Sequence, residues 1–147
     1  MEQDLVMIEA TIAAPRERVW QALTDPRELD GWLTLELDAP FKVGEMSTGT
    51  VYPIDEPMPW RSFTEVMEPP RQLVYRTPMV RIGEEITDDT SWLTTDTQLE
   101  PSGKDTYVRV IVTGLANAPI EERDTIVDDI TGSWKYLLSE LKAQVEE

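Results

Sequence analysis

Few side chains in this sequence could do acid–base chemistry, because its 147 residues include neither histidine nor cysteine. That composition excludes a His-based catalytic triad and a thiolate nucleophile. Two carboxylates, Glu65 and Asp96, and the phenol of Tyr75 fall within stretches that read as β-strands. A carboxylate turned towards the interior would have a raised pKa and could serve as an acid or a base, whereas one on the outer surface of a sheet would simply be solvated. We assign no catalytic residue and leave enzymatic activity open.

Metal and phosphate sites have equally little support in the sequence. Without Cys or His, zinc or copper would have to be held by oxygen ligands alone, which suits neither metal. The acidic run at 84–89 has the ligand chemistry of a calcium site but lacks the spacing and central glycine of an EF-hand loop, so a solvated loop is favoured. No glycine-rich phosphate-binding motif occurs. We therefore predict no metal site and no cofactor.

The residues are better suited to binding an apolar molecule, which requires apolar walls and a few oriented polar groups. Large amphipathic rings suit flat apolar ligands, so Trp134 and Tyr75 are the strongest candidates. Trp60, near a strand end, could border the opening or cover a sheet edge. The other candidates share inward-facing positions, and some of them must be plain core: Leu35, Leu73, Leu93, Thr95, Thr97, Ile130, Leu137, Leu141, Glu65 and Trp32.

The helical candidates must be positioned by the last stretch of the chain, residues 118–147. Pro119 suits a first helical turn, where a missing N–H costs little, and Glu121 and Glu122 lie near the positive end of the helix dipole. A helix of about 28 residues would be roughly 42 Å long and needs a large partner surface. Apolar residues recur there at helical spacing and form one stripe: Ile120, Val127, Ile130, Trp134, Leu137, Leu141 and Val145.

Nearly everything before that helix reads as β-strand. Two short helices are predicted at 16–23 and 27–31, with Asp25 as a cap and Pro26 opening the second. Two turns are predicted, at 40–44 and 101–104. Loops are predicted at 53–59 and 78–89, and the strand at 72–77 could continue into the first residues of the second loop. Alternation of apolar and polar residues predicts seven strands, at 5–13, 33–38, 45–52, 60–67, 72–77, 90–100 and 105–113.

Six consecutive strands joined by short connections are antiparallel neighbours, and the first strand is best placed beside the seventh. We therefore predict an α+β fold. A seven-stranded curved antiparallel sheet wraps around the long C-terminal helix, and two short helices lie between strands 1 and 2. The length suits one domain over residues 1–147.

The net charge of −16 limits the partners that the chain could have. It argues against nucleic acid and anionic membranes, both of which attract basic surfaces. It would suit a basic partner, but it would also suit a solvated acidic shell or a salt-rich source. No membrane span and no signal peptide are expected, and we expect a cytoplasmic protein whose oligomeric state the sequence leaves open.

Several phrases of the sequence resemble the START-like (SRPBCC, helix-grip) superfamily, and within it the activator of Hsp90 ATPase homologue 1-like branch. The phrases are APRERVWQALTDP at 14–26, Trp32, PPRQLV at 69–74, LEPSG at 99–103 and GSW at 132–134. That branch usually has a second tryptophan after Trp32, where this chain has Leu33. The 53–59 loop is also longer and richer in proline than the branch implies.

The resemblance implies a cavity between the sheet and the long helix. Such proteins bind lipids, polyketides or other apolar molecules, and some resemble the self-resistance proteins of enediyne producers. The function implied is therefore a binding protein that holds an apolar or aromatic ligand, for sequestration or self-resistance. The alternatives are an interaction module like the Hsp90 activators, with a chaperone partner, and a polyketide cyclase-like enzyme. The shared fold does not choose among them.

Overall fold

The structure is a computed structural model that describes residues 5–52, 57–78, 92–115 and 120–146, without the side chains of 58, 59 and 120–123. The predicted loops at 53–59 and 78–89, with their acidic run, fall largely outside the described residues. So does Pro119, and so do the side chains of Glu121 and Glu122. The elements are β1 (Leu5–Ile12), α1 (Arg16–Thr24), α2 (Pro26–Trp32), β2 (Leu35–Leu37), β3 (Met46–Val51), β4 (Met58–Glu68), β5 (Gln72–Pro78), β6 (Trp92–Ser102), β7 (Asp105–Thr113) and α3 (Ile120–Glu146).

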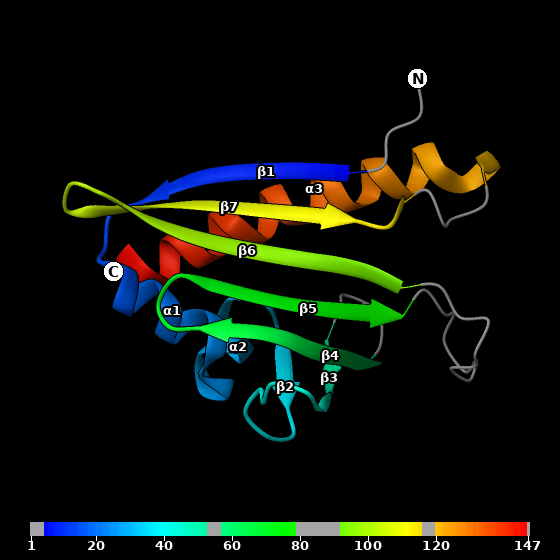
Figure 1. Cartoon of the computed structure of the whole chain (residues 1–147), viewed down its shortest axis with the longest axis horizontal. Coiled ribbons are helices and arrows are strands. Elements are labelled where there is room, and N and C mark those ends of the chain that lie inside the picture. The colour runs from blue at the N-terminus through cyan, green and yellow to red at the C-terminus, as the bar shows by residue number, and fades with distance from the viewer. Residues whose placement is uncertain (1–4, 53–56, 79–91, 116–119, 147) are drawn as a thin grey trace.

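The seven strands form one antiparallel sheet in the order β1-β7-β6-β5-β4-β3-β2. Figure 1 shows α3 running behind the sheet, and α1 and α2 lie near the C-terminal end of α3. The predicted α+β helix-grip fold, including the pairing of the first strand with the seventh, is confirmed. Among the described residues, no helix is long and apolar enough to cross a membrane.

The second strand is shorter than predicted, because its first two positions form the cap of α2 and the turn that leaves it. Leu33 caps α2 in the right-handed helical region, and its N–H donates to Leu29 O. Thr34 then has a positive φ of 52°, a conformation that a strand residue does not adopt. The strand is therefore confined to Leu35–Leu37.

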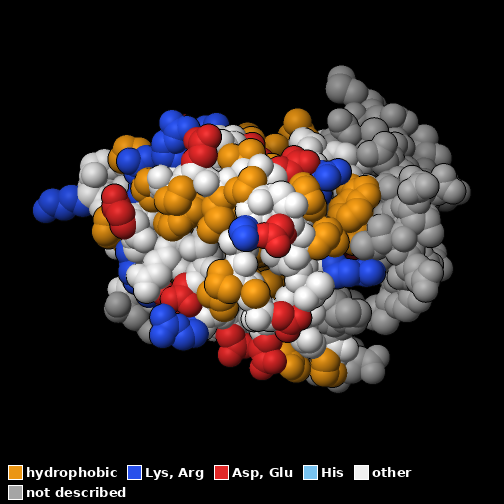
Figure 2. Space-filling model, turned by 60° about the horizontal axis from the view of Figure 1, so that its bottom comes forward, with side chains coloured by type: hydrophobic (Ala, Val, Ile, Leu, Met, Phe, Trp, Pro, Cys, Tyr) orange, Lys and Arg blue, Asp and Glu red, His pale blue; other side chains and the backbone are white. Residues whose placement is uncertain are grey.

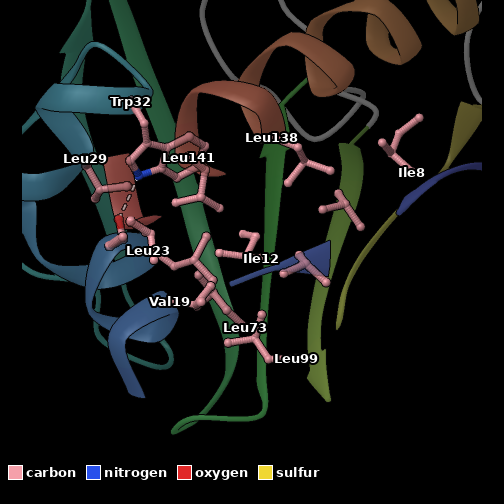
Figure 3. Packing of buried hydrophobic residues seen from close by; sticks show 14 of the residues in the cluster. Ile8, Ile12, Val19, Leu23, Leu29, Trp32, Leu73, Leu99, Leu138 and Leu141 are labelled. Atoms are coloured by element: carbon pink, nitrogen blue, oxygen red, sulfur yellow. Dashed lines mark hydrogen bonds between the residues drawn. The ribbon is translucent and has the colours of Figure 1, made fainter. Parts of the chain in front are cut away.

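The inward face of the sheet and the stripe of α3 enclose the core (Figure 3). Alternation decides which strand residues enter it: Val108, Val110 and Val112 of β7 are each at most 2 % exposed. From the predicted stripe of α3, Val127, Leu141 and Val145 reach the same cluster, and Leu138, outside the predicted stripe, joins them. The predicted amphipathic patterns therefore locate the core correctly on both layers.

Polar contacts join the three helices to one another. The indole Nε1 of Trp32 donates to Ala22 O at 2.8 Å, which joins α2 to α1 (Figure 3). Near the end of α3, Gln144 Nε2 donates to Glu28 O at 3.1 Å. α3 is therefore held against α2 by a hydrogen bond as well as by apolar packing.

The buried hydroxyl of Thr106 provides a test of how the sheet is tied to the first helix. Its Oγ1 donates to Ala14 O at 2.7 Å, and Thr106 is fully buried. Thr106→Val keeps the shape but leaves that carbonyl without its partner, so the free energy of unfolding should fall by about 1–3 kcal/mol. Urea denaturation measures this, with Thr11→Val on the exposed face of β1 as a control that should change little. Equal effects of the two substitutions would contradict the assignment.

Candidate functional site

Three aromatic rings meet on the inward face of the sheet. The ring centroids of Phe41, Trp60 and Tyr75 are 6.0 to 6.1 Å apart in all three pairs. These distances and the tilts of 40° to 60° are those of favourable edge-to-face and tilted contacts. The three rings therefore pack as one unit.

This unit forms part of an enclosed site, which we call the aromatic cage. Its ten lining residues come from both layers of the fold and share an inward orientation: Leu23, Leu29, Trp32, Leu33, Phe41, Trp60, Leu73, Tyr75, Thr97 and Trp134. Five of the ten are aromatic, and Thr97 and Tyr75 bring the hydroxyl groups. Strong apolar character with a few polar groups is the composition expected of a small-molecule site.

Each wall of the aromatic cage is positioned by a different element. Trp60 projects from β4, Tyr75 from β5 and Thr97 from β6, and the register places Leu73 opposite Thr97. The opposite wall comes from α3 through Trp134 and from α1 and α2. Because sheet, short helices and long helix all contribute, the site depends on the whole fold.

The aromatic cage is closed in this structure. The space open to a water molecule inside it is about 10 Å³. That is about the space for one water, whereas an engineered cavity of about 150 Å³ is what binds a single benzene ring. A ligand of even one ring therefore needs one of the lining side chains to move.

Two hydroxyl groups on the same face of β4 lack partners. Ser62 and Thr64 are fully buried, and neither side-chain oxygen hydrogen-bonds to any described residue. Ser62 and Thr64 are two and four residues after Trp60 and so lie on the same face of the strand as Trp60. Thr64 is paired with Tyr75 of β5. Buried hydroxyls are normally paired, so these two are unsatisfied groups next to the aromatic cage.

The phenol of Tyr75 is neutral at physiological pH. Burial raises the pKa of Tyr75 to about 12, because the phenolate would be desolvated among apolar side chains. A group with this pKa can donate a hydrogen bond but does not act as a general base near pH 7. Among the described lining residues, Tyr75 carries the only ionisable side chain.

The structure brings five of the sequence-predicted residues together in the aromatic cage: Trp32, Leu73, Tyr75, Thr97 and Trp134. Six others lie inside the fold but outside its lining. Leu35 and Leu141 are fully buried core, and Thr95 is buried opposite Tyr75. Leu93, Ile130 and Leu137 are partly buried against the core. These six positions are therefore packing positions in the closed structure.

Glu65 lies on the outer face of the sheet, which contradicts its placement among the ligand-facing residues. A bulge between Thr64 and Val66 interrupts the alternation of β4. Glu65 is exposed, and its Oε1 lies 2.6 Å from Arg76 Nε in an ion pair. Because Ser62 and Thr64 face inwards, alternation already puts Glu65 on the outer face, and the bulge shifts the residues that follow, so that Met67 rather than Val66 packs against the core.

Asp96 also faces outwards, where it is held by two amides. Its Oδ1 accepts from Gln72 Nε2 at 2.9 Å and its Oδ2 from Gln98 Nε2 at 3.1 Å. Neither strand carboxylate therefore enters the aromatic cage.

Phe41 is the lining residue that the sequence analysis missed entirely, since its segment was read as a plain turn. Leu23, Leu29 and Leu33 fall within the two predicted short helices and the second predicted strand, and Trp60 was predicted at the opening or at a sheet edge. A useful signal for Phe41 was its rarity, because the chain has only two phenylalanines. One of them stands in a turn, where an apolar ring is otherwise costly to expose.

A family model described as activator of Hsp90 ATPase homolog 1-like protein matches residues 13–146. The chain therefore belongs to the activator of Hsp90 ATPase homolog 1-like family. No curated protein sequence matches it.

Solved structures share the helix-grip fold at low sequence identity. DynU16, a protein in the dynemicin biosynthetic locus, aligns with a TM-score of 0.78 and 22% identity over 99% of this chain, which spans 48% of DynU16. A Mesorhizobium loti protein aligns with a TM-score of 0.75 and 20% identity, over 96% of this chain and 95% of that one. The Aha1 dimer from Colwellia psychrerythraea gives 0.74 and 18%, over 98% and 97%. At such identities the likeness shows the fold alone.

The raised pKa of Tyr75 predicts a loss of stability in alkali. In the unfolded chain tyrosine ionises near pH 10, whereas in the folded protein Tyr75 keeps its proton up to about pH 12. The folded state then binds more protons, so stability falls as the pH rises from about 10 to 12, by up to about 2–3 kcal/mol.

Tyr75→Phe should remove this part of the pH dependence, measured as the Tm between pH 8 and 11. Tyr136→Phe, at a 63% exposed position, is the matched control and should follow the wild type. If Tyr75→Phe lost stability in alkali as steeply as the wild type, the desolvation of this phenol would be refuted.

Proposed function

We propose that this chain binds an apolar, aromatic small molecule in the aromatic cage between the sheet and α3. The observation that carries the proposal is the convergence of five aromatic rings on one enclosed site: Trp32, Phe41, Trp60, Tyr75 and Trp134. Aromatic walls recognise flat ligands by stacking and edge contacts, and they bury a large apolar area. The family and its fold are compatible with such a role.

The aromatic cage differs in composition from the rest of the core. The largest fully buried side chains of the described chain are aliphatic, such as Ile12, Leu115 and Leu141. By contrast, Trp60, Tyr75 and Trp134 remain partly exposed although they pack against the core. Rings with an accessible edge can exchange protein contacts for ligand contacts at less cost than fully buried ones.

The biological role that we propose is to hold or sequester a natural product such as a polyketide. DynU16, which shares the fold, comes from a biosynthetic locus of this kind. Self-resistance would need only tight, stoichiometric binding. A cyclase-like activity would depend on orienting a reactive chain, with Tyr75 as a hydrogen-bond donor, because Glu65 faces outwards.

Protein interaction is the alternative role, and the net charge of −16 favours a basic partner for it. On the face shown in Figure 2, hydrophobic side chains lie in patches separated by acidic and basic ones. A partner held mainly by charge would bind less tightly as the salt concentration rises. Binding to a basic partner that does not weaken between low and high salt would argue against this alternative.

Native mass spectrometry of protein purified from its own host, followed by titration with planar polycyclic and lipid ligands, tests the proposal. Three of the five tryptophans, Trp32, Trp60 and Trp134, line the aromatic cage, so binding there should quench fluorescence. Trp134→Ala should weaken binding at least tenfold, because it removes one wall.

Trp20→Ala is the matched control. Trp20 is also partly buried against the core, but it lies outside the aromatic cage, so its loss should leave the affinity within about twofold. A protein that is empty as purified and shows no saturable response to any ligand would refute the proposal. So would equal weakening in the two variants.

A further inference from the structure

The segment between β2 and β3 places one side chain in the protein interior. Residues 38–46 are all described, and among them Phe41 alone is buried, at 8% exposure. Lys42 and Val43 beside it are exposed, Val43 at 52%. The burial that holds this loop in place is therefore the burial of one phenyl ring in the aromatic cage.

Backbone contacts hold the two ends of the loop but not its middle. Asp38 N donates to Thr48 O at 3.0 Å, and Gly44 N donates to Thr64 O at 2.8 Å. At the second end Thr64 N also donates to Glu45 O at 3.3 Å. Of the described backbone groups between Asp38 and Gly44, only Lys42 O takes part in a backbone hydrogen bond, which it accepts from Glu45 N. Gly44 has a φ of 84°, which glycine adopts without strain, and it can serve as a pivot.

The loop also has free space beside it. A cleft of about 200 Å³ adjoins it, lined by Asp38, Ala39, Pro40, Lys42, Glu45, Met46, Ser47 and Thr48. The loop can therefore move into this cleft, and Phe41 can leave the aromatic cage, without a clash. Withdrawal of Phe41 would leave room of the order of one aromatic ring, similar to an engineered cavity that binds benzene.

The unpartnered hydroxyls lie on the face that Phe41 covers. Phe41 packs on Trp60 and Tyr75, and Ser62 and Thr64 share the face of β4 that carries Trp60. Two buried hydroxyls without partners next to a closed aromatic site are positioned for a polar group that is absent from the closed structure.

We infer that Phe41 occupies the ring site of the ligand, and that Ser62 and Thr64 bind an oxygen substituent on the ring that replaces it. This inference rests on the proposed function and narrows its ligand class to planar aromatic molecules that carry hydroxyl or carbonyl groups. A hydroxyl side chain both donates and accepts, so either substituent satisfies it.

The ligand should also be uncharged. The described lining has no Lys or Arg to neutralise an anion, and the net charge of −16 opposes one. An enclosed cation would need a carboxylate, and Glu65 and Asp96 both lie on the outer face.

The test compares naphthalene with 2-naphthol, which differ by one hydroxyl, in titrations of the wild type and three variants. In Phe41→Ala no ring has to be displaced, so both molecules should bind about tenfold more tightly than in the wild type. Phe41→Leu should give a smaller gain in the same direction and serves if Phe41→Ala folds poorly. Phe63→Ala, which removes a ring that contacts Arg76 on the outer face, should leave both affinities unchanged.

The double variant Ser62→Ala/Thr64→Val tests the hydroxyl groups. Binding of 2-naphthol should weaken about tenfold while binding of naphthalene stays within twofold, because only the substituted ring uses the hydroxyls. The Tm should stay at or above that of the wild type, since the deleted groups have no partners in the closed protein.

Unchanged 2-naphthol binding in the double variant would overturn the role of the hydroxyls, and so would equal losses for both molecules. Unchanged binding in both Phe41 variants would overturn the role of Phe41. In each case naphthalene still binds and the proposed function stands. If neither molecule, nor any member of the wider ligand panel, binds to any variant, the proposed function itself fails.

Discussion

The 27-residue helix α3 can bury its apolar stripe only against the inward face of one curved sheet, and much of the structure follows from that constraint. A curved sheet of seven strands is wide enough to cover the helix, and α1 and α2 lie near the C-terminal end of α3 (Figure 1). The polar contacts from Gln144 to Glu28 and from Lys142 Nζ to Thr11 O fix the C-terminal half of α3 against both layers. The remaining interior space lies between the sheet and Trp134.

The interior between the sheet and α3 has two regions that differ in the side chains that fill them. Near β1 and β7 aliphatic side chains fill the interior, and the buried hydroxyl of Thr106 is paired with Ala14 O, as in an ordinary protein interior. Near β4 and β5 the filling is aromatic, and Ser62 and Thr64 are left without partners. Unsatisfied buried hydroxyls reduce stability, so their presence beside an aromatic enclosure favours binding over stability as the reason for this composition.

The fold could be predicted from the sequence because each element carries its own periodic signal. Alternation in β7 and the stripe of α3 each identify one buried face, and only one arrangement buries both. The strand boundaries were less accurate where tertiary context decides them. Thr34, for example, takes a positive φ because α2 ends directly before β2, and no local propensity indicates this.

The aromatic cage was only partly predictable, for two physical reasons. The side that Glu65 takes depends on which face of β4 is inward, and the buried residues that decide this, Ser62 and Thr64, are polar and give no hydrophobic signal. The β4 bulge then shifts the phase, so that Met67 rather than Val66 packs against the core. Phe41 lies in a loop, and its burial depends on rings from β4 and β5 that are distant in sequence. By contrast, Tyr75 and Trp134 were correctly expected to face the interior, because each is a large ring on the apolar face of its strand or helix.

Phe41 is the residue on which both the closed structure and its opening depend, and NMR can observe it directly. In the free protein, nuclear Overhauser effects should connect the ring of Phe41 with those of Trp60 and Tyr75, whose centroids lie 6.1 Å away. With saturating 2-naphthol, these effects should disappear, and the ligand protons should instead show them to Trp60, Tyr75 and Trp134. Persistence of the Phe41 contacts while the ligand is bound elsewhere on the protein would contradict the aromatic cage as the binding site.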